Sequence, residues 1–250
     1  MVFVTGDTHG DWINRLNVNS FPEQKEMTKD DYVIICGDFG IWDNSKREKY
    51  NLSWLDDKPF TTLFVSGNHE NYDILDSLEM SEWHGGLVNF VRKSVIHLMR
   101  GQVFNIEDKT FFTFGGASSH DISAGILEPD DPNFKEKKKQ LDKDPFALYR
   151  INHVSWWERE LPSENEMEMG LNNLKKENNK VDYIITHSPS TSELYLMGGK
   201  GLYQSDILTN YLEDVKANTE YKRHFFGHMH WDKAINDKDV CLYEQIIRIL

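Results

Sequence analysis

Five short apolar runs constrain this chain more than any other feature of its sequence. Each run is continuous rather than alternating and stops at a polar or turn-forming residue. Continuous apolar runs of this length are typical of strands that are buried on both faces, as in layered α/β proteins. The runs are VFV (2–4), YVIIC (32–36), TTLFVS (61–66), YIIT (183–186) and HFF (224–226).

Side chains that can bind a metal ion follow each of these runs. In an open α/β sheet, ligands bind beyond the carboxyl ends of the strands. The pattern therefore predicts that these side chains, although far apart in sequence, meet at one edge. Glycines before several of them suit sharp turns. The residues are Asp7, His9, Asp38, Asn68, His69, His187, His228 and His230.

Other segments predict further strands and two helices. Runs at 95–99, 102–106, 110–116 and 243–250 are rich in aromatic and β-branched residues and indicate a β meander. Ser163 with Glu166 forms a capping-box pattern at the start of a helix over 163–179. A second apolar stripe predicts a helix over 205–216, with Ser205 as its N-cap.

The chain is expected to form a single domain, residues 1–250, with a cap or lid insertion at about 117–162. The stretch 128–144 is highly polar and is interpreted as an exposed loop or flexible lid. A surface excursion without a role is the alternative interpretation. Aromatic and basic residues near the end of the insertion are candidates for a cap in which an arginine reaches a phosphate group. They are Arg150, Trp156, Trp157 and Arg159.

Composition narrows the classes of partner. The formal charge is −13, and two divalent ions would leave it at −9, which disfavours a groove for long nucleic acids. Two cysteines exclude a disulfide framework and a thiolate zinc site. No signal peptide or apolar segment long enough to span a membrane is visible, so a cytoplasmic location is expected. No sequence feature indicates an oligomeric state.

The order of the motifs resembles the calcineurin-like metallophosphoesterase superfamily. That family carries D-x-H, G-D, G-N-H-[DE], a lone His and G-H-x-H. The resemblance spans residues 2–231 and implies an α/β fold, a two-layer β sandwich flanked by helices, with two metal ions between the sheet edges. The matching motifs are Asp7-Thr-His9, Gly37-Asp38, Gly67-Asn68-His69-Glu70, His187 and Gly227-His228-Met-His230.

The resemblance also implies a ligand set. The first metal would take Asp7, His9, Asp38 and His230, and the second would take Asp38, Asn68, His187 and His228. Asp38 would then bridge the two ions, which two-metal hydrolases hold about 3.5–4 Å apart. Nitrogen and oxygen ligands without sulfur suit divalent Mn²⁺, which is preferred here, or Fe or Zn²⁺.

The implied chemistry is hydrolysis of a small phosphate ester by a hydroxide that bridges the metals. Asp38 and His69 are the expected catalytic residues, with His69 on the leaving-group side. Ile41 and Trp42 stand where the protein phosphatase branch has aspartate and arginine. The residue that orients His69 is therefore open, and Glu70 and Asp43 are two hypotheses for it. The sequence favours a phosphodiesterase acting on a nucleotide or other small phosphodiester. A phosphomonoesterase or protein phosphatase, or a catalytically silent protein-binding scaffold, is the alternative.

Candidate substrate contacts lie outside the ligand set. His120 and Asp121 follow a predicted strand as the metal loops do, although a local turn is the simpler interpretation. Trp42 and Trp231 are close to ligands in sequence and offer faces that could stack on a ring, or they pack the sheet edge. Lys200, within the glycine-rich segment 197–206, precedes a predicted helix and could help to hold an anion.

Overall fold

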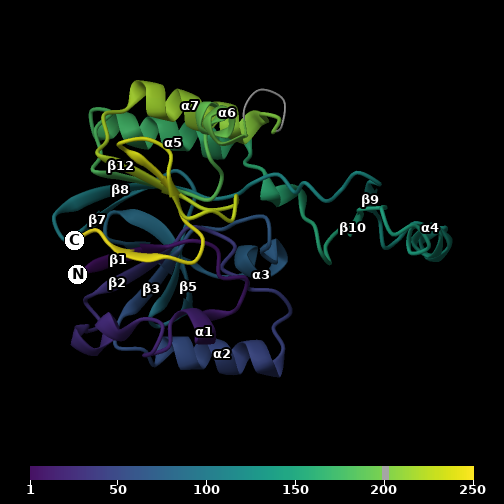
Figure 1. Cartoon of the computed structure of the whole chain (residues 1–250), viewed down its shortest axis with the longest axis horizontal. Coiled ribbons are helices and arrows are strands. Elements are labelled where there is room, and N and C mark those ends of the chain that lie inside the picture. The colour runs from purple at the N-terminus through teal and green to yellow at the C-terminus, as the bar shows by residue number, and fades with distance from the viewer. Residues whose placement is uncertain (199–202) are drawn as a thin grey trace.

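A computed structural model describes residues 1–198 and 203–250, and it has four layers (Figure 1). Two β-sheets pack face to face, and helices cover the outer face of each sheet. The first sheet has the strand order β15-β1-β2-β3-β6-β5-β4, and the second has the order β13-β14-β12-β11-β8-β7. The predicted α/β fold, a β sandwich flanked by helices, is confirmed. Lys200 lies outside the described residues.

The first sheet is built around three parallel strands. They are β1 (Val2–Thr5), β2 (Tyr32–Ile35) and β3 (Thr61–Phe64). All of their side chains are buried, as their continuous apolar sequences predict. The other members are β6 (Val95–Leu98), β5 (Gly86–Arg92), β4 (Met80–Trp83) and β15 (Ile246–Arg248), and the outer layer contains α1 (Trp12–Arg15), the 3₁₀ helix Pro22–Glu26, α2 (Lys46–Asp56) and α3 (Tyr72–Asp76).

The second sheet also has a parallel centre. Its strands β8 (Lys109–Phe114), β11 (Tyr183–Thr186) and β12 (Arg223–Phe226) run in the same direction. Their carboxyl ends therefore open at one edge. The remaining strands are β7 (Gln102–Ile106), β14 (Asp239–Cys241) and β13 (Lys233–Ala234), and the covering helices are α5 (Glu164–Lys176), α6 (Thr191–Gly198) and α7 (Ile207–Asn218).

Apolar side chains from both sheets form the central core. Val4, Ile34 and Leu63 of the first sheet lie in one buried cluster with Ile185 and Phe225 of the second. Separate clusters join each sheet to its own helices. Each central strand is thus buried on both faces, which fixes the positions of the loops that follow it.

Two predictions about the elements are wrong. The expected meander is divided between the sheets, because β6 pairs with β3 while β7 and β8 form a hairpin in the other sheet. The N-cap of α7 is Asp206 rather than Ser205, and its carboxylate accepts a hydrogen bond from the backbone N–H of Thr209. Ser163 does form the predicted capping box at α5.

The insertion projects from the body as an arm (Figure 1). It contains β9 (Ile126–Leu127) and β10 (Arg150–Ile151), which pair in parallel, and α4 (Phe134–Leu141) lies between them. The polar stretch 128–144 is exposed as expected, but it holds a helix rather than only a loop. A 3₁₀ turn, Glu158–Glu160, returns the chain to the body. None of the described helices is long and apolar enough to cross a membrane.

Candidate metal centre

The first group of predicted ligands meets at the carboxyl edge of the sheets. One potential ligand atom from each of Asp7, His9, Asp38 and His230 lies within 4.8 Å of the others. The Nε2 atoms of His9 and His230 are 3.1 Å apart, and His230 Nε2 is 3.2 Å from Asp7 Oδ2. Such crowding of nitrogen and oxygen donors suits a single divalent cation.

The second group adjoins the first through Asp38. Its Oδ2 lies 3.7 Å from His9 Nε2, whereas its Oδ1 lies 3.3 Å from His187 Nε2. His187 Nε2 is also 3.3 Å from Asn68 Oδ1, and the His187 ring is 5.0 Å from the His228 ring. The two oxygens of Asp38 thus face different groups of donors, which is the arrangement a bridging carboxylate needs.

The hydrogen bonds around these side chains hold them in position. His187 Nδ1 donates to the backbone oxygen of Cys36 at 2.8 Å, which leaves Nε2 free to act as a ligand. The backbone N–H of His228 donates to Asp7 Oδ1 at 3.0 Å, and that of His69 donates to Asp38 Oδ1 at 2.7 Å. Each carboxylate is therefore fixed by a loop that comes from another strand.

The backbone of the metal loops is unusual. His9, Asp38, His228 and His230 all have positive φ, between 44° and 65°. A non-glycine residue in this region carries strain that the surrounding structure must offset, and such strain is common at functional sites. At Gly37 (φ +89°) a Cβ would overlap the ring of His187, so only glycine fits there.

Asp7 and Asp38 are paired with histidines and not with a described lysine or arginine side chain. Both carboxylates are buried. Burial lowers the pKa of His187, but Asp38 and Asp7 outweigh it and raise that pKa to about 9. A histidine thus supplies the missing positive charge in the metal-free site. The donor set, four imidazoles, two carboxylates and one amide, fits two divalent ions of the Mn²⁺, Fe or Zn²⁺ type.

His69 lies beside the ligands and is not part of either group. Its ring centre is 5.0 Å from that of His9 and 6.4 Å from that of Trp42. Neither candidate for orienting it does so. Glu70 accepts hydrogen bonds from the backbone N–H groups of residues 39–41, and Asp43 accepts one from Ser45. Those two hypotheses are wrong because Glu70 stabilises the loop that follows β2 and Asp43 stabilises its own turn.

The contact that His69 does make was not predicted. Its Nε2 lies 3.2 Å from Nη2 of Arg150, which is in turn paired with Asp121. Arg150 belongs to β10 of the arm, 81 residues away in sequence. The signal in the sequence was the position of Arg150 among aromatic and basic residues near the end of the insertion.

The four candidate substrate residues differ in position. His120 Nε2 is 2.9 Å from His228 Nε2, so the loop after β8 reaches the second group of ligands. Asp121 faces Arg150. Trp42 is half-buried against Trp157, with ring centres 5.7 Å apart, and Trp231 is 40% exposed and lies under Lys233. Trp42 therefore borders the ligands, whereas Trp231 faces outward.

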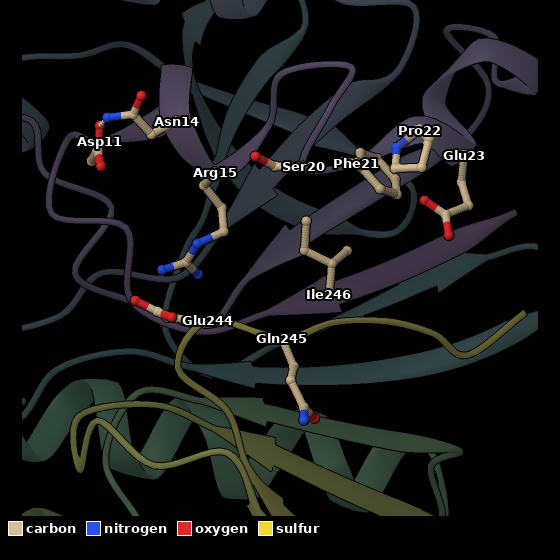
Figure 2. A pocket seen from close by; sticks show the side chains of 10 residues that line it. All are labelled: Asp11, Asn14, Arg15, Ser20, Phe21, Pro22, Glu23, Glu244, Gln245 and Ile246. Atoms are coloured by element: carbon tan, nitrogen blue, oxygen red, sulfur yellow. Dashed lines mark hydrogen bonds between the residues drawn. The ribbon is translucent and has the colours of Figure 1, made fainter.

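One cavity borders the predicted ligands, and another lies away from them. One of about 220 Å³ opens beside His9 and Trp42, at the start of α2. A larger one of about 500 Å³, drawn in Figure 2, lies between Arg15 and Glu244 and has none of the predicted ligands among its labelled side chains. Of these two cavities, the smaller one borders a predicted ligand, His9.

Comparisons with known proteins identify the family of this chain. The family model described as calcineurin-like phosphoesterase matches residues 1–232. No curated protein matches the sequence. The crystal structure of phosphopantetheinyl hydrolase (PptH) from Mycobacterium tuberculosis is similar over 96% of this chain and 89% of that one, at 12% identity and a TM-score of 0.41, which is too remote for an argument about function. The chain therefore belongs to the calcineurin-like phosphoesterase family and is a metal-dependent phosphoesterase.

Proposed function

We propose that the protein is a dinuclear hydrolase of small phosphodiesters, such as a nucleotide diester. The observation that carries the proposal is the placement of Asp38, whose two oxygens face two groups of nitrogen and oxygen donors. Within this proposal, Asp7, His9, Asp38 and His230 hold one ion. Asp38, Asn68, His187 and His228 hold the other. Mn²⁺ is the preferred metal because the donors include no sulfur.

Bound divalent ions supply Lewis-acid stabilisation of phosphoryl oxygens and lower the pKa of bound water from 15.7 to about 7. The residues of the chain position the ligands of these ions. The hydrogen bond from His187 Nδ1 to Cys36 fixes the tautomer whose Nε2 faces Asp38 and Asn68. Glu70 holds the loop of Asp38 by accepting three backbone hydrogen bonds.

His69 is proposed to act on the leaving-group side. It lies next to His9 and Trp42, which border the cavity of about 220 Å³. An imidazole can donate a proton to a leaving oxygen or stabilise its charge near neutral pH. We expect His69→Ala to retain both metals and to lower turnover by about 10²–10⁴-fold. Metal analysis with steady-state kinetics checks this, and an unchanged rate would remove His69 from the mechanism.

The preference for diesters rests on the second motif, which lacks the aspartate and arginine of the protein phosphatase branch, and on the cavity beside Trp42. The cavity offers room and an aromatic face for a second ester group. A direct test compares bis-p-nitrophenyl phosphate with p-nitrophenyl phosphate in the presence of Mn²⁺. Cleavage of the diester alone supports the proposal. Cleavage of the monoester alone favours a phosphatase, and cleavage of neither favours a silent scaffold.

A further inference from the structure

Arg150 is buried although its segment is not. Only 6% of its surface is exposed, whereas Phe146 and Leu148 just before it are 86% and 48% exposed. A long cationic side chain is rarely buried unless a specific partner or function holds it. The arm therefore brings one charged group into the body, and it brings that group to the metal centre.

Its contacts hold the guanidinium rigidly. Nε and Nη2 donate to the two oxygens of Asp121, at 2.6 and 3.0 Å, and Nη1 donates to the backbone oxygen of Ser155 at 2.8 Å. This fork-to-fork pairing fixes both the position and the plane of the group. The Asp121 side chain is about half exposed, so solvent or a ligand can reach the pair.

A second Nη2 hydrogen points at His69. Arg150 Nη2 is 3.2 Å from His69 Nε2, and His69 lies beside His9. Because a guanidinium can only donate, His69 Nε2 accepts this hydrogen bond. An anionic oxygen bound beside His69 can accept from the same Nη2 hydrogen in place of Nε2, and a charge-assisted bond of this kind is the stronger one. A phosphoryl oxygen or a leaving-group oxygen of a phosphate ester is an oxygen of this kind.

We propose that Arg150 binds a phosphoryl oxygen of the substrate beside His69, and that Asp121 positions Arg150 for this contact. The inference rests on the proposed function, because it places the phosphate at the metal centre. The arm then completes the site: β10 supplies a permanent positive charge that the five strand-end loops do not. Arg150 is a catalytic residue in this scheme, and Asp121 is a positioning residue.

The test measures binding of inorganic phosphate to the Mn²⁺-loaded protein by calorimetry, together with metal content and hydrolysis of bis-p-nitrophenyl phosphate. Arg150→Ala should keep two metals, bind phosphate about 10–100-fold more weakly and lower kcat/KM by about 10²–10³-fold. Lys138→Ala, an exposed change on α4 of the same arm, should alter none of these values. Phosphate affinity within twofold of the parent, or loss of metal from Arg150→Ala, would overturn the proposal.

Two further variants keep the test decisive. Arg150→Lys retains the charge and loses the fork, so its phosphate affinity should fall less than that of Arg150→Ala but by more than twofold. Asp121→Asn should weaken phosphate binding only when Arg150 is present, and the double variant should match Arg150→Ala. Additive effects of the two changes count against a positioning role. The protein could bind phosphate through Arg150 and yet cleave neither nitrophenyl ester. That result would disprove the proposed function, but it would still support Arg150 as a phosphate-binding residue.

Discussion

Two groups of acidic and histidine side chains with metal-ligand spacing occur among the described residues, and β12 or the loop after it contributes to both. Past its carboxyl end are His228 and His230, and near its start is His224, which lies with Glu193 and Asp239. Potential ligand atoms of Glu193, His224 and Asp239 lie within 4.8 Å of one another, as they do in the first metal group. By residue type and spacing the two groups look alike.

The difference between them is Lys216. Its Nζ lies 2.6 Å from Glu193 Oε1 and 2.8 Å from Asp239 Oδ2, so an ammonium group of α7 neutralises this cluster. His224 completes it by contacting Glu193 at 2.8 Å. Asp7 and Asp38 have no such lysine or arginine partner among the described residues. We call Glu193, His224 and Asp239 the closed cluster, because Lys216 neutralises it permanently. We call Asp7, His9, Asp38 and His230 the open cluster, because only histidines face its carboxylates and these can exchange a proton for a metal ion.

The largest expected effect follows from breaking the open cluster. Asp38→Ala should bind fewer than two metal ions and lower kcat/KM by more than about 10³-fold, because several kcal/mol of charge stabilisation are lost. Metal analysis and diester hydrolysis in added Mn²⁺ measure both changes. A variant that keeps two ions and normal turnover would show that Asp38 is not the shared ligand.

Breaking the closed cluster should affect stability instead. Lys216→Met leaves Glu193 and Asp239 buried without their counter-charge, and we expect the free energy of unfolding to fall by about 3–5 kcal/mol. Urea denaturation measures the change. Activity per folded molecule and metal content should not alter.

The matched control is Lys222→Met, which removes an exposed ion pair with Asp182 and should cost at most about 1 kcal/mol. If the two lysine variants lose the same free energy of unfolding, burial of Glu193 and Asp239 does not make the ion pairs of the closed cluster stronger than an ion pair at the surface.

Added metal should distinguish the two clusters by its effect on the free energy of unfolding. At a free Mn²⁺ concentration 100 times the dissociation constant, each site adds about 2.7 kcal/mol to the free energy of unfolding. Thermal unfolding should show the corresponding rise in Tm for the parent and for Lys216→Met. Asp38→Ala should show a much smaller rise. A full rise in Asp38→Ala would place the stabilising metal elsewhere.

The open cluster could be predicted from sequence because its members follow recognisable strands. β1, β2, β3, β11 and β12 are continuous apolar runs, and the residues after them meet because parallel strands end at one edge. The division of the predicted meander between two sheets could not be foreseen, since pairing partners are set by long-range packing rather than by β propensity.

The contact of Arg150 with His69 and the role of Lys216 show why the rest could not be predicted. Arg150 comes from a polar segment where basic residues are usually exposed, and its burial depends on Asp121 and His69, which are distant in sequence. Lys216 occupies one position of an otherwise ordinary amphipathic helix. In both cases the role of the residue depends on the side chains that it contacts in the folded protein, and the neighbouring sequence does not reveal those contacts. The assignment of Glu70 to His69 failed for the same reason.

The smallest expected effect is the response of the closed cluster to acid in metal-free protein. Burial favours the protonated form of Glu193, but His224 and Lys216 outweigh it and hold its pKa well below the ordinary value of 4.5. The unfolded chain therefore takes up this proton first. The contribution of Glu193 to stability is fully present above pH 4.5 and is lost as the pH falls further, by at most about 1.4 kcal/mol per pH unit.

Urea unfolding between pH 6 and pH 3.5 in a chelator tests this response by comparing the parent with Glu193→Gln. The glutamine variant should start less stable and lose stability with a shallower slope, because its side chain takes up no proton. Glu168→Gln removes an exposed carboxyl group of α5 and should keep the parent's slope. If Glu193→Gln follows the parent's slope, the acid sensitivity belongs to other carboxylates. The lysine of the closed cluster would then neutralise Asp239 more than Glu193, which places the strongest pairing on β14 rather than on α6.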